Sequence, residues 1–287
     1  AEAYVEMTDI KSEQDEALDE LLQEFHDSED LHPAVILQAD TKQIRAYRRG
    51  GEIVTVSGDG LKFAARMIDD KAPPNKRLRR GAVIRVQSDE KNNWQIAQMP
   101  EVEAALLATD PQNGAVRSLV GGFDYNRNKF NHSTQAWRQP GSSFKPFIYS
   151  GSLEKGFTPA SIVQDDPISF PASVTGSQAW EPKNYDGKYE GAMSMRTALA
   201  KSKNMVSIRL LQASGVHFIQ DYVTRFGFDA DKHPPYLTMA LGAGSVTPWQ
   251  MVTAYSVFAN GGYRISPFIV REIQDEKGQT LAAAQPV

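Results

Sequence analysis

The sequence predicts a small β-barrel followed by an α+β domain. Short β-type runs separated by Gly, Asp and Asn fill the stretch from His32 to about Gln98. Two further strands around a turn follow Pro100, and long helical patterns come only after them. Of the 287 residues, 41% are hydrophobic and only 23% are charged, so the chain can bury a core of this size. Strands followed by helices are typical of the α+β class.

Residues 12–26 have the pattern of an amphipathic helix. Its apolar residues recur at helical spacing along one face, as Ala17, Leu18, Leu21, Leu22 and Phe25. Acidic residues surround this face, and we favour a solvated surface over a partner-binding one as the explanation. We expect residues 1–33 to form a linker strand and this helix, associated with the domain that begins at residue 99.

The barrel is expected over residues 34–98. Its five β-type runs are 34–37, 44–47, 53–56, 82–86 and 94–97. A basic loop at 71–80 contains Lys76, Arg77, Arg79 and Arg80. Barrels of the oligonucleotide-binding (OB) shape stack bases on clustered aromatic residues, and aromatic residues are sparse here. We therefore expect no nucleic acid partner and interpret the loop as solvated.

The α+β domain is expected over residues 99–287. Strands at 104–109 and 115–120 flank a turn that ends in Asn113-Gly114, two residues that tolerate the positive φ of a hairpin. Helical patterns follow at 142–153, 194–201, 206–213 and 248–259. Asn260-Gly261-Gly262 ends the last of them.

Composition excludes several kinds of site. The chain has no cysteine, which rules out disulfides, thiolate nucleophiles and cysteine-bound zinc. The five histidines are scattered without ligand spacing, and we predict neither a metal nor a cofactor. A net charge of -4 gives no global attraction to nucleic acid or anionic lipid. No apolar run approaches the ~18 residues of a membrane span.

The pattern Ser-x-x-Lys, which can pair a nucleophile with a base, occurs three times, at 88–91, 142–145 and 152–155. The first copy lies in a polar turn without a rigid element, and we reject it. Ser142 follows a Gln-Pro-Gly break and precedes an apolar helical run, so it should lie at a helix start. Lys145 then shares its face of the helix. Ser152 is rotated well away from that face and is expected at the surface.

A serine hydroxyl needs a nearby base, and lysine can be that base only if its pKa falls from ~10.4. Burial would lower the pKa of Lys145, and a helix N-terminus would favour the oxyanion formed on an attacked carbonyl. A capping serine followed by a surface lysine explains these residues equally well. Ser202-Lys203-Asn204 breaks the tie, because this link between two helical patterns can present Ser202 and Asn204 into a cleft. Alone, that tripeptide would more often be a helix cap.

Together these motifs resemble those of the penicillin-binding proteins and serine β-lactamases, whose signatures are Ser-x-x-Lys, Ser-Asp-Asn and Lys-Thr-Gly. Longer strings at 138–147, 180–186, 197–204, 240–248 and 254–262 resemble class A penicillin-binding proteins. The preceding barrel resembles the 1A type of Gram-negative bacteria. The resemblance implies a penicillin-binding/serine β-lactamase-like transpeptidase domain preceded by an OB-like barrel.

By this resemblance the chain is a serine D,D-transpeptidase or carboxypeptidase that cross-links peptidoglycan. The D-Ala-D-Ala end of a stem peptide acylates Ser142, and an amine of a neighbouring strand takes the acyl group. β-Lactam antibiotics acylate the same serine, and the implied catalytic set is Ser142, Lys145, Ser202 and Asn204. The family also implies the periplasmic face of the bacterial inner membrane. A regulatory outer-membrane lipoprotein is an implied partner of the barrel.

Two departures from the family pattern stand out. No Lys-Thr-Gly or Lys-Ser-Gly occurs in the chain, and we expect the strand that carries it to follow Val287. The membrane helix and the glycosyltransferase domain of class A proteins are missing as well. We therefore expect a soluble fragment with a truncated transpeptidase domain, taken from a membrane-anchored bifunctional protein. A β-lactamase is disfavoured by the barrel, while a penicillin-sensing receptor stays open as an alternative.

Overall fold

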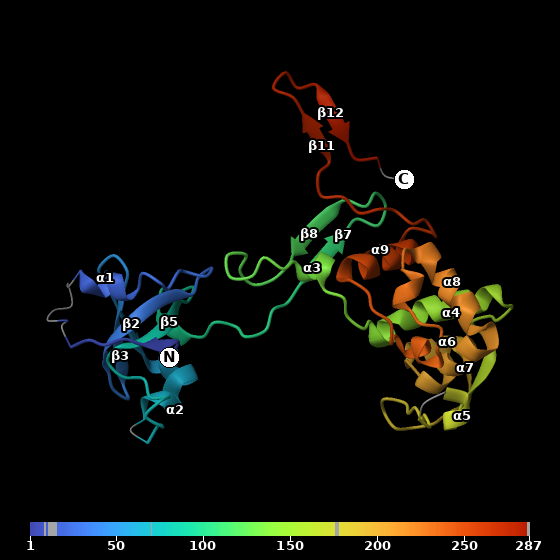
Figure 1. Ribbon diagram of the computed structural model, residues 1–287, viewed down its shortest axis with the longest axis horizontal. Coiled ribbons are helices and arrows are strands. Elements are labelled where there is room, and N and C mark those ends of the chain that lie inside the picture. The colour runs from blue at the N-terminus through green and yellow to red at the C-terminus, as the bar shows by residue number, and fades with distance from the viewer. Residues whose placement is uncertain (9, 11–15, 70, 176–177, 286–287) are drawn as a thin grey trace. The chain divides into compact units, whose positions relative to one another are not determined.

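The computed structural model describes residues 1–8, 10, 16–69, 71–175 and 178–285 (Figure 1). The chain divides into two compact units. The barrel unit consists of Ala1–Glu103 and Asp124–Asn128, and the helical unit consists of Ala104–Phe123 and Lys129–Val287. Among the described residues, no helix has both the length and the apolar character needed to cross a membrane.

The barrel unit is built on one six-stranded sheet in the order β1-β5-β2-β3-β4-β6, which closes because β5 also pairs with β6. Its strands are β1 (Ala3–Tyr4), β2 (His32–Ala39), β3 (Gln43–Arg48), β4 (Glu52–Ser57), β5 (Ala82–Ser88) and β6 (Trp94–Ala97). All five predicted β-type runs lie within these strands, and β1 is an addition. The predicted barrel is therefore confirmed.

Alternation along the strands sends side chains to two apolar clusters on opposite sides of the sheet. Ile36, Ile44 and Val56 are fully buried in the interior cluster, which a 3₁₀ turn (Gly58–Ala64) and α2 (Ala65–Ile68) close. Val35 and Tyr47 join the outer cluster. Apolar clusters cover both faces of the sheet, so side chains that point to either face of a strand can be buried.

We expected residues 1–33 to associate with the second domain, but they belong to the barrel unit. The strand β1 pairs with β5, with Ala3 opposite Val83, and α1 (Ala17–Leu21) packs Leu18 on the outer barrel cluster. The helix predicted over 12–26 ends at Leu21, and residues 12–15 of that prediction lie outside the described part. After α1, Arg49 donates hydrogen bonds to the carbonyl oxygens of Leu22 and Phe25.

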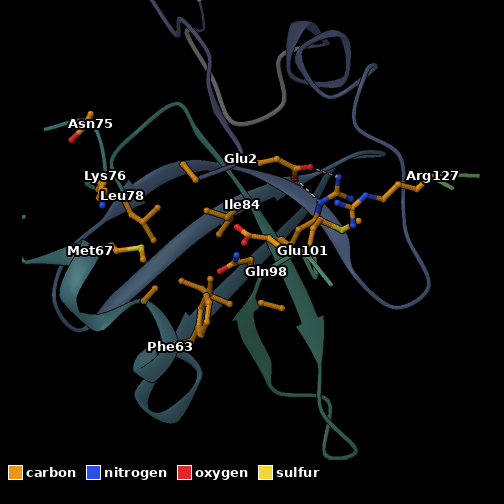
Figure 2. Close-up of a pocket in the computed structure, with 16 residues that line it drawn as sticks. Glu2, Phe63, Met67, Asn75, Lys76, Leu78, Ile84, Gln98, Glu101 and Arg127 are labelled. Carbon is orange, nitrogen blue, oxygen red and sulfur yellow. Dashed lines mark hydrogen bonds and ion pairs between the residues drawn. The ribbon is translucent and has the colours of Figure 1, made fainter. Parts of the chain in front are cut away.

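A hollow of about 450 Å³ opens in the barrel unit (Figure 2). Its apolar lining includes Phe63, Met67 and Leu78, and Glu2 lies at its edge. The Glu2 carboxylate accepts two hydrogen bonds from the buried Arg85 guanidinium, at 2.7 and 3.0 Å. This ion pair ties the start of the chain to β5.

The helical unit begins with the predicted hairpin, now β7 (Leu106–Thr109) and β8 (Val116–Val120). Two more antiparallel strand pairs are β9 (Ile162–Asp165) with β10 (Gly191–Ser194) and β11 (Glu272–Gln274) with β12 (Thr280–Ala283). Its helices are α3 (His132–Gln135), α4 (Lys145–Glu154), α5 (Ala172–Thr175), α6 (Met195–Ala200), α7 (Asn204–Ser214), α8 (Val216–Tyr222) and α9 (Pro248–Ala259). The four predicted helical patterns coincide with α4, α6, α7 and α9 within three residues.

The core of this unit forms around α4, which contacts α6, α7 and α8 (Figure 1). Phe144, Phe147 and Ile148 are fully buried there. The Phe147 ring alone contacts five other aromatic rings, those of Phe144, Phe226, Phe228, Tyr255 and Phe258. Such dense packing holds α4 rigidly and with it any side chain at its start.

Candidate active site

Ser142 lies at the start of the buried helix, as the sequence predicts. It belongs to a 3₁₀ turn (Gly141–Phe144) that leads directly into α4, and its carbonyl oxygen accepts the backbone N–H of Lys145. The Ser142 side chain is exposed, and within the described part of the chain its hydroxyl makes no hydrogen bond. An exposed hydroxyl on a rigid turn is accessible to a substrate.

A second segment, residues 238–246, fixes the turn that carries Ser142. The N–H of Gly141 donates to the carbonyl of Gly242 at 3.3 Å, and Arg138 and Val246 exchange two backbone hydrogen bonds of 2.9 and 3.0 Å. A Cβ added to Gly242 would lie 2.1 Å from the Gly141 carbonyl oxygen. Gly242 is therefore required for this close approach, and its φ of +70° also favours glycine.

Lys145 meets Ser202 and Asn204 inside the protein. The lysine is only 1% exposed, and its Nζ donates to Ser202 O at 2.6 Å, to Asn204 Oδ1 at 2.7 Å and to Ser202 Oγ at 3.0 Å. Three of the four residues singled out from the sequence thus form one hydrogen-bonded group. The fourth, Ser142, lies one helical turn before Lys145 and outside that group.

These contacts suit a lysine that is neutral for part of the time. Burial lowers the pKa of Lys145 to about 8, and among the described residues no carboxylate contacts its amine to offset the loss of water. A neutral amine keeps two N–H donors, and the two carbonyl-type oxygens of Ser202 and Asn204 match them. Its lone pair then accepts the Ser202 hydroxyl proton, or is free when that hydroxyl turns away.

The link between α6 and α7 has a strained backbone that aims its groups at the lysine. Ser202 has a φ of +52°, in the left-handed region that residues other than glycine rarely adopt. The Ser202 N–H donates to Leu199 O at 3.0 Å and the Lys203 N–H donates to Ala198 O at 2.9 Å. Such strain persists only where surrounding contacts hold it, and it is often found at functional sites.

Lys203 is a residue whose environment sequence reasoning missed. Its ammonium is 2% exposed and lies 2.9 Å from Glu190, 3.2 Å from Asp186 and 3.3 Å from Asp165. Burial alone would lower the pKa of Lys203, but hydrogen bonds to the three carboxylates together raise it above its ordinary value. No local signal marks this cluster, because the carboxylates come from separate segments.

Ser152 is a correction to the sequence analysis. We expected a surface serine, yet its side chain is fully buried, donating to Ile148 O at 2.9 Å and accepting from Ser214 Oγ at 2.9 Å. The helix α4 is covered on several sides, so a residue rotated away from the Ser142 face still lies in the core. Ser88, by contrast, is exposed at the end of β5.

No metal site is visible in the part of the chain that the structure describes, since no three His, Cys, Asp or Glu side chains are grouped to hold an ion. The acceptors around Lys145 are themselves neutral oxygens. The groups that this site presents are the serine hydroxyls, the lysine amine and the asparagine amide.

Comparison with protein families gives two matches that together cover almost the whole chain. Residues 104–287 match the penicillin-binding protein transpeptidase domain, and residues 1–102 match the penicillin-binding protein OB-like domain. The first match alone covers more than half of the chain.

Curated relatives and solved structures agree with these matches. Penicillin-binding protein 1A of Neisseria lactamica is 43% identical over all of this chain, and that of Pseudomonas aeruginosa is 41% identical over 89% of it. The crystal structure of penicillin-binding protein 1A from Haemophilus influenzae matches with a TM-score of 0.87 at 35% identity, over 99% of this chain and 41% of that one. The present chain spans 36% of the Neisseria relative and 32% of the Pseudomonas one.

Proposed function

Because the chain belongs to the penicillin-binding protein transpeptidase family, we propose that it carries the acyl-transfer centre of a serine D,D-transpeptidase that cross-links peptidoglycan. The observation that supports this most is the buried Lys145 amine, held by Ser202 and Asn204 one helical turn after an exposed Ser142. Each of the four residues then has a distinct role in one reaction.

In the first step neutral Lys145 takes the proton of Ser142, and the serine Oγ attacks the carbonyl carbon of the penultimate D-alanine. The C–N bond to the terminal D-alanine breaks, and the leaving nitrogen receives a proton through Ser202, whose hydroxyl contacts the Lys145 ammonium at 3.0 Å. D-Alanine departs, and the acyl group remains as an ester on Ser142.

In the second step an amine of another stem peptide attacks this ester. The amine loses a proton to the lysine, the C–O bond to Ser142 breaks, and the serine oxygen regains a proton. A β-lactam enters the same first step, but its C–N bond lies in a ring, so the leaving nitrogen stays attached to the acyl group. Penicillin V is bound in the solved structure of the relative PonA1 from Mycobacterium tuberculosis, which is 26% identical over 64% of this chain.

The wider setting is a proposal drawn from the family resemblance. We propose that the chain acts at the periplasmic face of the bacterial inner membrane, in a membrane-anchored protein that also carries a peptidoglycan glycosyltransferase and D-Ala-D-Ala carboxypeptidase activity. The OB-like barrel would contact a regulatory lipoprotein of the outer membrane. Turnover of a D-Ala-D-Ala peptide by the full-length protein separates this enzyme from a penicillin-sensing receptor, and slow release of the penicilloyl group separates it from a β-lactamase.

Mass spectrometry of a digested penicillin adduct tests the nucleophile. We expect one modified peptide, with the penicilloyl group on Ser142. The natural comparison is the second Ser-x-x-Lys copy, since Ser152 is followed by Lys155 at the same spacing but is buried. An adduct on Ser88 or Ser152, or no adduct in the full-length protein, would end the assignment.

A further inference from the structure

A loop that the proposed reaction does not use lies against the catalytic link. Residues 183–190 follow the string Trp180-Glu181-Pro182, and Asn184 reaches from this loop to the start of α7. The Asn184 side chain is 4% exposed. Its Oδ1 accepts the backbone N–H of Asn204 at 2.8 Å and that of Met205 at 3.3 Å.

The other half of the Asn184 amide is satisfied as completely. Its Nδ2 donates to Asp165 Oδ1 at 2.6 Å and to Lys188 O at 2.7 Å, so all four hydrogen-bonding positions of the amide are used. The fully buried Asp165 carboxylate can only accept hydrogen bonds when ionised, and this dictates which face of Asn184 carries the NH₂ group. Lys203 in turn lies 3.3 Å from Asp165.

The same loop sets the orientation of the Asn204 amide. Asn204 Nδ2 donates to the carbonyl oxygen of Lys183 at 2.7 Å, which leaves Oδ1 to face Lys145. The N-cap residue of α7, Lys203, provides no side-chain cap of its own. Asn184 therefore supplies the missing acceptor from a distant part of the chain, directly behind the residue that contacts the lysine.

We propose that Asn184 is a positioning residue for the acyl-transfer centre. It acts through Asn204, whose backbone it anchors beside the Lys183 carbonyl that orients the Asn204 amide. The Asn204 Oδ1 thereby stays aimed at Lys145. This role rests on the proposed function. In this series of contacts Lys203 holds Asp165, and Asp165 orients Asn184. Asn184 then anchors Asn204, which contacts Lys145.

The first test compares two capping asparagines in the full-length protein. Asn184→Ala should lower the rate constant of acylation by fluorescent penicillin at least about tenfold, because misplaced catalytic groups cost rate steeply. Asn131, which caps α3 through Ser133 N at 3.0 Å, provides the matched control. Asn131→Ala should label at the wild-type rate.

The labelled fraction separates positioning from folding. A positioning defect slows labelling while every molecule is eventually labelled, whereas a folding defect lowers the labelled fraction and leaves the rate constant of the remainder unchanged. If Asn184→Ala labels with the wild-type rate constant, the proposal is overturned, whatever fraction of the molecules becomes labelled. Failure of the wild-type protein to label at Ser142 would instead remove the proposed function, and this role with it.

A swap tests the contact itself, including the case in which Asn184→Ala does not fold. Asn184→Asp sets a second carboxylate against Asp165 and should slow acylation. Adding Asp165→Asn restores one amide and one carboxylate in exchanged positions, with the wild-type net charge. We expect the double variant to recover most of the lost rate; a double variant as slow as Asn184→Asp would overturn the proposal.

Discussion

Lys203 belongs to the link between α6 and α7, and Lys145 contacts that link from α4. Both lysines are buried, at 1% exposure for Lys145 and 2% for Lys203. The Lys145 amine contacts only neutral oxygens, of Ser202 and Asn204, and burial lowers its pKa to about 8. For Lys203 burial acts in the same direction, but three carboxylates outweigh it and raise the pKa above its ordinary value.

The difference teaches that burial alone does not make a lysine a base. The charge of its neighbours decides between a group that can give up its proton and a permanent cation that holds a fold together. The two buried lysines therefore have different roles. Lys145 serves the chemistry, and Lys203 serves the scaffold on which that chemistry is placed.

The largest effect is expected from Lys145→Met. Loss of the proposed general base should lower the acylation rate by about 100- to 10,000-fold while the protein stays folded, since the variant removes a buried amine that carries no ion pair. Lys145→Arg should fail too, because a guanidinium keeps its proton. Stopped-flow labelling with fluorescent penicillin measures both. Lys155→Met, at the second Ser-x-x-Lys copy, is the control and should label normally; near-normal labelling of Lys145→Met would show that another group takes the proton.

Lys203→Met should show the opposite behaviour, a loss of stability. The buried Asp165 carboxylate would lose its cation, and we expect the free energy of unfolding to fall by about 3 kcal/mol. This is the low end for a broken buried pair, because Asp186 and Glu190 are partly exposed. Urea denaturation checks the value. Lys201→Met, which removes only an exposed partner of Glu190, should cost much less. Equal losses in the two variants would contradict the contrast.

His233 extends the comparison to a third buried basic side chain. Its ring stacks on Phe144 at 4.6 Å, neither ring nitrogen has a hydrogen-bond partner among the described residues, and burial lowers its pKa to about 4. The unfolded histidine takes a proton below about pH 6.5 and the folded one only below about pH 4, so stability is lost as pH falls through this window. From pH 7 to pH 5 the loss should be about 2 kcal/mol.

Thermal unfolding across this pH range measures the effect. His233→Leu removes the titration and should lose less stability than the wild type between pH 7 and pH 5. An unchanged pH dependence in this variant would mean that other groups account for the whole effect.

Asn204→Asp replaces the neutral amide beside Lys145 with a carboxylate, so Lys145 gains a neighbour like those of Lys203. The pKa of Lys145 should rise, so acylation at pH 7 should slow by about tenfold or more and recover partly at higher pH. The wild-type rate should increase through pH 8 and then level off. A pH profile of the acylation rate tests both expectations. A variant whose profile coincides with that of the wild type would separate Asn204 from the ionisation of Lys145.

The sequence predicted what depends on local pattern. Short β-type runs separated by turn residues predicted the barrel strands. The helical periods on both sides of Ser202-Lys203-Asn204 predicted a break there, and the structure has Ser202 in the link and Asn204 as the first residue of α7. What depends on distant partners was not predictable. β1 pairs with β5 across most of the barrel unit, and no periodicity near residue 3 indicates this.

The same reason explains the two surprises in the helical unit. Ser152 was assigned to the surface from its angle around α4, but the angle says nothing about how many neighbours cover a helix. Lys203 was visible only as the middle residue of a motif. Its partners Asp165, Asp186 and Glu190 come from a strand and a loop, which only the folded chain brings together.

The contrast between the two lysines can be measured directly by following their side-chain NMR signals through a pH titration, with each signal assigned from its Lys→Met variant. We predict that the Lys145 signal titrates near pH 8, while the Lys203 signal shows a protonated amine over the whole range in which the protein stays folded. A Lys145 ammonium that keeps its proton up to pH 10 would contradict the account, because no neutral base would then be present beside Ser142.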